Sequence, residues 1–127
     1  MKFFIGIYSL FLILLSSPQD IPYNEIENAF MKKNSDVVAR MGNDKLMISI
    51  HGKESICSNK QAALVLKDFF IKNPITSFKF IFKGKENQEA SFAIASYESK
   101  QDKFRFTFHF SKQESTHKII GINIEKE

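Results

Sequence analysis

Phenylalanine occupies every second position from 104 to 110, and this run constrains the fold more than any other feature of the sequence. Alternate side chains of a β-strand point to opposite faces, so the run predicts a strand with one aromatic face and one polar face. A second run has phenylalanine at positions 78, 80 and 82. Because each buried phenylalanine removes about 150 Å² or more from water, we expect both rows to lie on the dry side of one sheet.

The composition is that of a folded domain rather than of a disordered or low-complexity chain. The sequence has 127 residues, of which 43% are hydrophobic and 25% are charged. A chain of this length has room for one domain, since domains typically contain about 100–150 residues. The single cysteine excludes an internal disulfide framework and any metal site built from several cysteines.

The first residues have the plan of a secretory signal. Lys2 is followed by an apolar stretch at positions 3–15 and then by two serines. The stretch is shorter than the roughly 20 residues of a membrane-spanning helix. We therefore predict a signal peptide at residues 1–17 and a single domain at residues 18–127, exported to the periplasm or the extracellular space with no stable membrane span after cleavage. The alternative is an uncleaved signal that anchors the chain in a membrane by its N-terminus.

Helix signals dominate the first half of the remaining chain. Asp20 and Pro22 are typical of a helix start, and Ser58-x-x-Gln61 is a capping box directly before an apolar run. These signals and the helical spacing of apolar residues predict helices at 20–33, 34–41 and 59–72.

Strand signals dominate the second half. Alternation predicts strands at 45–51, 77–83, 91–98, 104–111 and 116–126. In the last of these, Ile120, Ile122 and Ile124 are expected on one face. The connections between the last four strands are short and polar, as in an antiparallel meander. Helices first and strands after indicate an α+β fold.

This order of elements resembles the nuclear transport factor 2-like superfamily, also called cystatin-like, and more narrowly the exported bacterial family named domain of unknown function 4783. The residues that carry the resemblance are Ala29-Phe30, Ser58-x-x-Gln61-Ala62, Phe69-Phe70, Ser77-Phe78, Lys83-Gly84 and Phe104-Arg105-Phe106. The resemblance implies a cone, in which three N-terminal helices pack on a curved antiparallel sheet. It carries no catalytic assignment, because these motifs are capping and packing residues.

One candidate binding face comes from the polar residues between the phenylalanines. Arg105, Thr107 and His109 share the face opposite the aromatic row. Enzymes of the wider superfamily have a pocket between sheet and helices with an Asp or His base, so these residues would meet a ligand if their face lined the cone. If the aromatic face lines it, they face solvent or a partner. The simpler interpretation is a polar, solvated outer face.

Cys57 is the second candidate. It directly precedes the cap Ser58, where a helix dipole favours a thiolate, and His51 lies six residues upstream. A Cys-His pair of this kind suggests a nucleophile, but no oxyanion donor or orienting group accompanies it. The alternatives are a small packed residue or an intermolecular disulfide formed after export.

The sequence has no motif for a metal, cofactor or nucleic-acid site. His51, His109 and His117 fall on separate predicted strands without a metal-ligand spacing, and the glycines are isolated, so we expect no metal and no cofactor. The segment from position 45 to 85 contains eight lysines and only two acids. This excess predicts either a basic patch for anionic envelope polymers or a solvated surface. Export argues against a nucleic-acid partner.

The sequence therefore predicts an exported module without enzymatic activity that binds a small apolar ligand or another protein through its sheet. A homodimer through the face of Arg105, Thr107 and His109 is part of this prediction. The alternative is a small pocket enzyme of the ketosteroid-isomerase-like type that uses a His or the Cys. The two hypotheses differ in whether the cone is open or filled.

Overall fold

The structure is a computed structural model that describes residues 21–127, so the predicted signal at residues 1–17 and the predicted cap Asp20 lie outside the described residues. In the described part, the elements follow the order α1 (Tyr23–Met31), α2 (Ser35–Arg40), β2 (Gly42–Ile50), β3 (Lys53–Ser58), α3 (Asn59–Lys72), β4 (Ile75–Lys85), β5 (Ala90–Ser99), β6 (Lys103–Gln113) and β7 (Thr116–Lys126). Within these residues, no helix is both long and apolar enough to cross a membrane.

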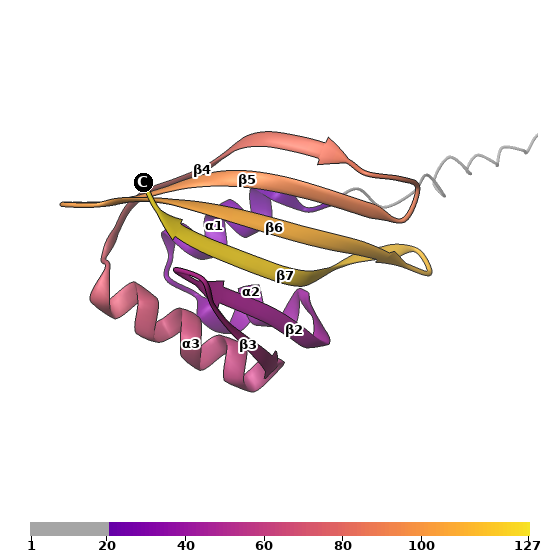
Figure 1. Cartoon of the computed structure of the whole chain (residues 1–127), viewed down its shortest axis with the longest axis horizontal. Coiled ribbons are helices and arrows are strands. Elements are labelled where there is room, and N and C mark those ends of the chain that lie inside the picture. Colours follow the sequence, from indigo (N-terminus) through magenta and orange to yellow (C-terminus); the bar gives the residue numbers. More distant parts are fainter. Residues whose placement is uncertain (1–20) are drawn as a thin grey trace, which may run out of the picture.

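The strands form one six-stranded sheet in the order β3-β2-β7-β6-β5-β4. The sheet is curved, and the helices lie together on one side of it (Figure 1). This confirms the predicted α+β class. Two details of the predicted cone differ. The sheet is not purely antiparallel, because β2 pairs with β7 in parallel. The strand predicted at 45–51 does precede α3, but it is one arm of a hairpin whose second strand, β3, was not predicted.

Local sequence signals explain the two helices that frame this hairpin. The Asn34 side chain caps α2 by accepting a hydrogen bond from the backbone N–H of Val37 at 3.3 Å. The predicted capping box of α3 is present, since the Ser58 hydroxyl accepts from the Gln61 N–H and the Gln61 side chain accepts from the Ser58 N–H. The first predicted helix is shorter than expected, because Pro22 is its N-cap rather than a residue of its first turn.

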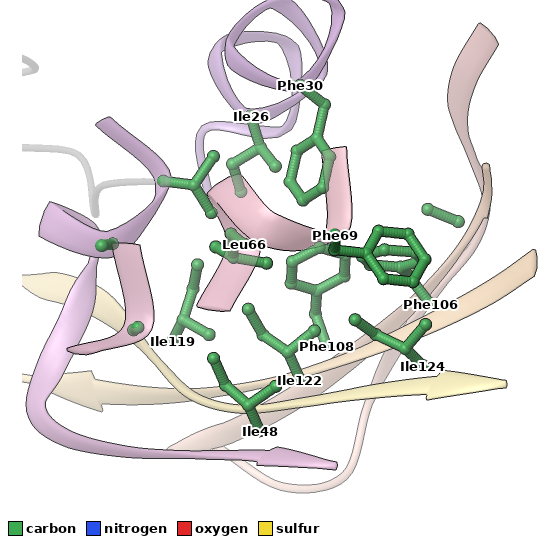
Figure 2. Packing of buried hydrophobic residues seen from close by; sticks show 14 of the residues in the cluster. Ile26, Phe30, Ile48, Leu66, Phe69, Phe106, Phe108, Ile119, Ile122 and Ile124 are labelled. Atoms are coloured by element: carbon green, nitrogen blue, oxygen red, sulfur yellow. The ribbon is translucent and has the colours of Figure 1, made fainter. Parts of the chain in front are cut away.

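The core lies between the helices and what we call the inner face of the sheet. Figure 2 shows Leu66 and Phe69 of α3 between the helix α1 above and the sheet below. Phe30 of α1 stacks on Phe78 with ring centroids 4.0 Å apart and meets Phe106 edge-on at 5.5 Å. All four phenylalanines of β6 are buried, as the alternation predicted.

Two bulges change the alternation along β4 and β7. The register of β4 shifts between Phe80 and Phe82, so that Phe82 pairs with Ile94 on the outer face and is 50% exposed. The prediction that Phe82 belongs to the dry row is therefore wrong. A similar shift in β7 buries Ile119 and leaves Ile120 exposed, which corrects the predicted row of Ile120, Ile122 and Ile124.

Candidate functional site

Aromatic side chains fill the interior of the cone. Tyr97 is fully buried and stacks on Phe106 with ring centroids 5.1 Å apart. Its hydroxyl donates a hydrogen bond to the backbone carbonyl of Asn73, and burial raises the pKa of the phenol above its usual value. Phe69 meets Phe104 edge-on at 5.1 Å. The interior is thus occupied by side chains that pack on one another, and the polar groups with free surface lie elsewhere.

Cys57 does not form a nucleophile site with His51. Cys57 lies in β3, pairs with Leu46 and is 3% exposed. His51 is exposed in the turn at the opposite end of that strand. Burial raises the pKa of the Cys57 thiol, which opposes the thiolate that a helix dipole would favour. The position of Cys57 in the core fits the alternative of a small packed residue and leaves the thiol out of reach for a second chain.

Arg105, Thr107 and His109 share the face of the sheet opposite the helices, which we call the outer face. Arg105 and His109 are exposed and Thr107 is half-buried, while the phenylalanines between them are buried. The Arg105 guanidinium lies 3.3 Å from a carboxylate oxygen of Glu127. His109 therefore points away from the interior, so it is not placed as the base of a pocket enzyme.

The outer face is less polar than the alternation predicted. In the register of the sheet, one row across all strands consists of Ile56, Met47, Gly121, His109, Phe92 and Gly84. Met47 is 40% exposed and Ile56 is 70% exposed. An apolar band crosses the outer face, formed by Met47, Ile56 and Phe92 of this row, by Phe82 beyond the β4 bulge and by Ile120, the extra residue of the β7 bulge. The polar outer face expected from Arg105, Thr107 and His109 holds for β6, whereas this band on the other strands was not predicted.

The ring of Phe82 helps to build this band. It packs beside the ring of Phe92 with centroids 5.5 Å apart, and both rings lie over Gly84. A Cβ atom on Gly84 would come within 2.8 Å of Phe92 and 2.9 Å of Phe82, so only glycine leaves room for both rings. The sequence signal for this arrangement was the unbroken apolar run Phe80-Ile81-Phe82, which does not fit a regular alternating strand.

A cavity of about 950 Å³ lies at one end of the cone, and we call it the mouth cavity. The first residues of α1 form one wall of this cavity. The other wall is formed by the strands β4 to β7 near the β4–β5 and β6–β7 turns, which lie at the right in Figure 1. Its charged and titratable lining residues are Glu25, Lys83, Lys85, Lys112 and His117, with Tyr23 beside them. Neither His109 nor Cys57 lines it. This grouping could not be predicted from the sequence, because it depends on the bulge in β4.

One polar atom of a residue that lines the mouth cavity lacks a hydrogen-bond partner. The Nδ1 atom of His117 is buried and has no hydrogen-bond partner in the described part of the chain. Only Lys83 and Lys85 of the eight lysines between positions 45 and 85 line the cavity. The others lie on β2, β3, α3 and the outer face of β4. Among residues 21–127, no three His, Cys, Asp or Glu side chains lie close enough to hold a metal ion.

Comparison with known families decides where the chain belongs. A profile of the family "Domain of unknown function (DUF4783)" matches residues 23–125, which is most of the chain. The chain belongs to the DUF4783 family. The crystal structure of a DUF4783 protein from Bacteroides ovatus is 26% identical, covers 86% of this chain and 97% of its own, and superposes with a TM-score of 0.79. No curated protein matches the sequence.

More distant structures place DUF4783 within a wider fold. A domain of unknown function with a cystatin-like fold from Nostoc punctiforme is 10% identical, covers 82% of this chain and 72% of its own, and has a TM-score of 0.66. An NTF-2 like protein of unknown function from Silicibacter pomeroyi is 9% identical, covers 82% and 88%, and has a TM-score of 0.61. At these identities the likeness shows the fold alone. It confirms the predicted resemblance to the nuclear transport factor 2-like and cystatin-like fold.

Proposed function

We propose that this protein is an exported interaction module without enzymatic activity, and that two copies pair through the outer face of the sheet. The apolar band across that face carries the proposal, because exposed apolar patches on folded proteins mark interaction surfaces. The filled interior supports it as well, since the aromatic packing leaves the outer face and the mouth cavity as the surfaces for binding.

The dimensions of the outer face suit a stable dimer. Six strands spaced about 4.8 Å apart and about nine residues long present on the order of 700 Å². A standard protein interface buries about 800 Å² on each partner. The outer face is therefore comparable in area to one side of a standard protein interface.

The arrangement of residues is also self-complementary. A two-fold axis parallel to the strands, passing between the central strands β7 and β6, places β7 of one copy over β6 of the other and β2 over β5. Met47 then lies over Phe92 of the second copy. Glu125 and Arg105, which are neighbours in the register, lie over each other across the interface. The apolar groups of β2 and β5 thus meet each other and the acid meets the base, while Phe82 on the edge strand β4 lies over Glu54 on β3 of the second copy.

Sedimentation equilibrium of the purified protein at tens of micromolar tests this proposal. We expect a mass of two chains, and the variants Met47→Glu and Phe82→Glu are expected to sediment as monomers because each buries a charge in the apolar band. Ile71→Glu is the matched control, since Ile71 is an exposed apolar residue on α3 at 68% exposure. A single-chain mass for the unchanged protein would overturn the proposal.

Export is supported by the charged, apolar and small-residue plan of residues 1–17. N-terminal sequencing of protein recovered from the cell envelope or the medium is expected to begin near Pro18. A recovered chain that still begins near Lys2 would contradict cleavage and favour the membrane anchor.

A further inference from the structure

We propose that the mouth cavity binds a small organic oxyanion, a carboxylate or phosphate joined to an apolar group. The proposal goes beyond pairing through the outer face, because the mouth cavity lies on the inner side of the sheet.

The bulge in β4 aims two lysines toward the helices. Beyond the bulge, Lys83 pairs with Ala93, which is fully buried on the inner face, and Lys85 pairs with the buried Ser91. Both lysine side chains therefore extend from the inner face, whereas regular alternation from Phe80 would have turned them toward the outer face. Both lysines remain exposed at the rim of the core, so their ammonium groups are open to an anionic ligand in the cavity.

A second basic pair stands opposite them on β6 and β7. Phe110 and Ile119 form the last buried pair of these strands, and the next inner-face pair toward the turn is Lys112 and His117. Both residues line the mouth cavity. The Nδ1 atom of His117 is itself buried and lacks a partner within residues 21–127, so it is not one of the groups that a ligand in the open cavity would contact. Four basic side chains thus converge on one cavity from three strands.

The opposing charge in the cavity is small. Glu25, in the first turn of α1, is the only acid that lines it among the described residues. The N-terminus of α1 also faces the cavity, and its dipole adds partial positive charge there. The Lys83 ammonium lies 4.6 Å from the centroid of the Tyr23 ring, a cation–π contact that holds this lysine at the cavity. The local field therefore attracts an anion.

The cavity also has an apolar part, which sets the class of ligand. Ile21, Pro22 and the Tyr23 ring line it on the helix side. A smaller cavity of about 140 Å³ shares Pro22 and His117 with it and is otherwise lined in part by Ile26 and Phe110. A ligand that joins an oxyanion to a ring or short hydrocarbon chain would satisfy the lysines and cover these apolar side chains at once.

Titration of amide NMR signals with four probes tests the proposal. Phenyl phosphate and benzoate carry an oxyanion on an apolar ring, inorganic phosphate lacks the ring, and phenol lacks the charge. We expect at least one of the ring oxyanions to bind saturably and shift the amides of Lys83, Lys112 and His117. Tighter binding of phenyl phosphate than of benzoate indicates a phosphate ligand, and the reverse order indicates a carboxylate. Inorganic phosphate is expected to bind about tenfold more weakly than phenyl phosphate, and phenol not to bind at this site.

Variants separate a built site from general attraction to a basic protein. The double variant Lys83→Gln/Lys112→Gln is expected to weaken binding of the ring oxyanion by about tenfold or more, and Glu25→Gln to strengthen it about two- to threefold. Lys79→Gln is the matched control, because Lys79 lies on the outer face of the same strand. Met47→Glu is expected to bind as tightly as the unchanged protein.

Three results would overturn the proposal. One is the absence of saturable binding by either ring oxyanion. Another is equal affinity in the unchanged protein and in the double lysine variant. The third is a loss in Lys79→Gln as large as in the double variant, which would indicate diffuse attraction rather than a site.

Discussion

At the scale of single residues, Tyr97 joins the aromatic core to the end of α3. Its ring is fully buried among phenylalanines, and its hydroxyl donates to the carbonyl of Asn73, the residue that follows α3. Burial raises the pKa of the phenol, so the folded protein keeps this group neutral at pH values where an unfolded tyrosine ionises. The hydrogen bond therefore stabilises the fold at neutral pH and loses that effect in alkali.

Tyr97→Phe is expected to lower the free energy of unfolding by about 1 kcal/mol at pH 7, because it removes this hydrogen bond. Because the pKa of Tyr97 is raised in the folded protein, the unfolded chain ionises first, above pH about 10. Below that pH the contribution of Tyr97 to the free energy of unfolding is fully present, and above it the contribution declines by about 1.4 kcal/mol per pH unit. The difference between the two proteins should then shrink and reverse between pH about 10 and 11.5. Urea unfolding at several pH values measures the difference in free energy of unfolding between the two proteins. A difference that stays constant across this range would contradict a raised pKa of Tyr97.

For most of the core residues on the strands, the face predicted from regular alternation in the sequence is correct. The phenylalanines of β6 point inward because that stretch has no bulge before Phe110. Phe82 and Ile120 were misplaced because a bulge inserts one residue and reverses the faces beyond it. The sequence holds a trace of each bulge, since Ile81-Phe82 and Ile119-Ile120 put apolar residues side by side. The lysines of the mouth cavity were missed for the same reason.

At the scale of elements, α3 shows how much a local signal can determine. Its predicted bounds, residues 59–72, agree with the structure, because the capping box at Ser58 and the Asn73-Pro74 pair lie at its two ends. The strand β3 was not predicted. Only Cys57 of its residues is buried, so the strand lacks an alternating pattern, and its pairing follows from the turn at His51 and Gly52, where both φ angles are positive.

Ser58→Ala is expected to lower the free energy of unfolding by about 1 kcal/mol, because it removes the hydroxyl that accepts from the Gln61 N–H at 3.2 Å. Ser58→Thr should restore most of the loss, since threonine also caps helices. Ser55→Ala is the control, because Ser55 is an exposed serine on the same strand and has no side-chain hydrogen bond among those of the described residues. Thermal or urea unfolding gives the comparison, and equal losses for Ser55→Ala and Ser58→Ala would show that the cap contributes nothing.

At the scale of the whole molecule, the two surfaces that we propose for binding lie on opposite sides of the sheet. The apolar band occupies the outer face, and the mouth cavity opens on the inner side at one end of the cone. The sequence predicted the outer face as a partner surface through Arg105, Thr107 and His109. It did not predict Met47, Ile56 and Phe82, because the register that aligns them across strands is a tertiary property.

The most direct measurement of the proposed pairing is an isotope-filtered NOE experiment on a mixture of labelled and unlabelled protein, which reports only contacts between chains. For the pairing proposed above, we expect intermolecular NOEs from the methyl groups of Met47 and Ile56 to the rings of Phe82 and Phe92 of the second copy. Intermolecular NOEs confined to the exposed apolar residues of α3, or none at concentrations where sedimentation gives two chains, would contradict it.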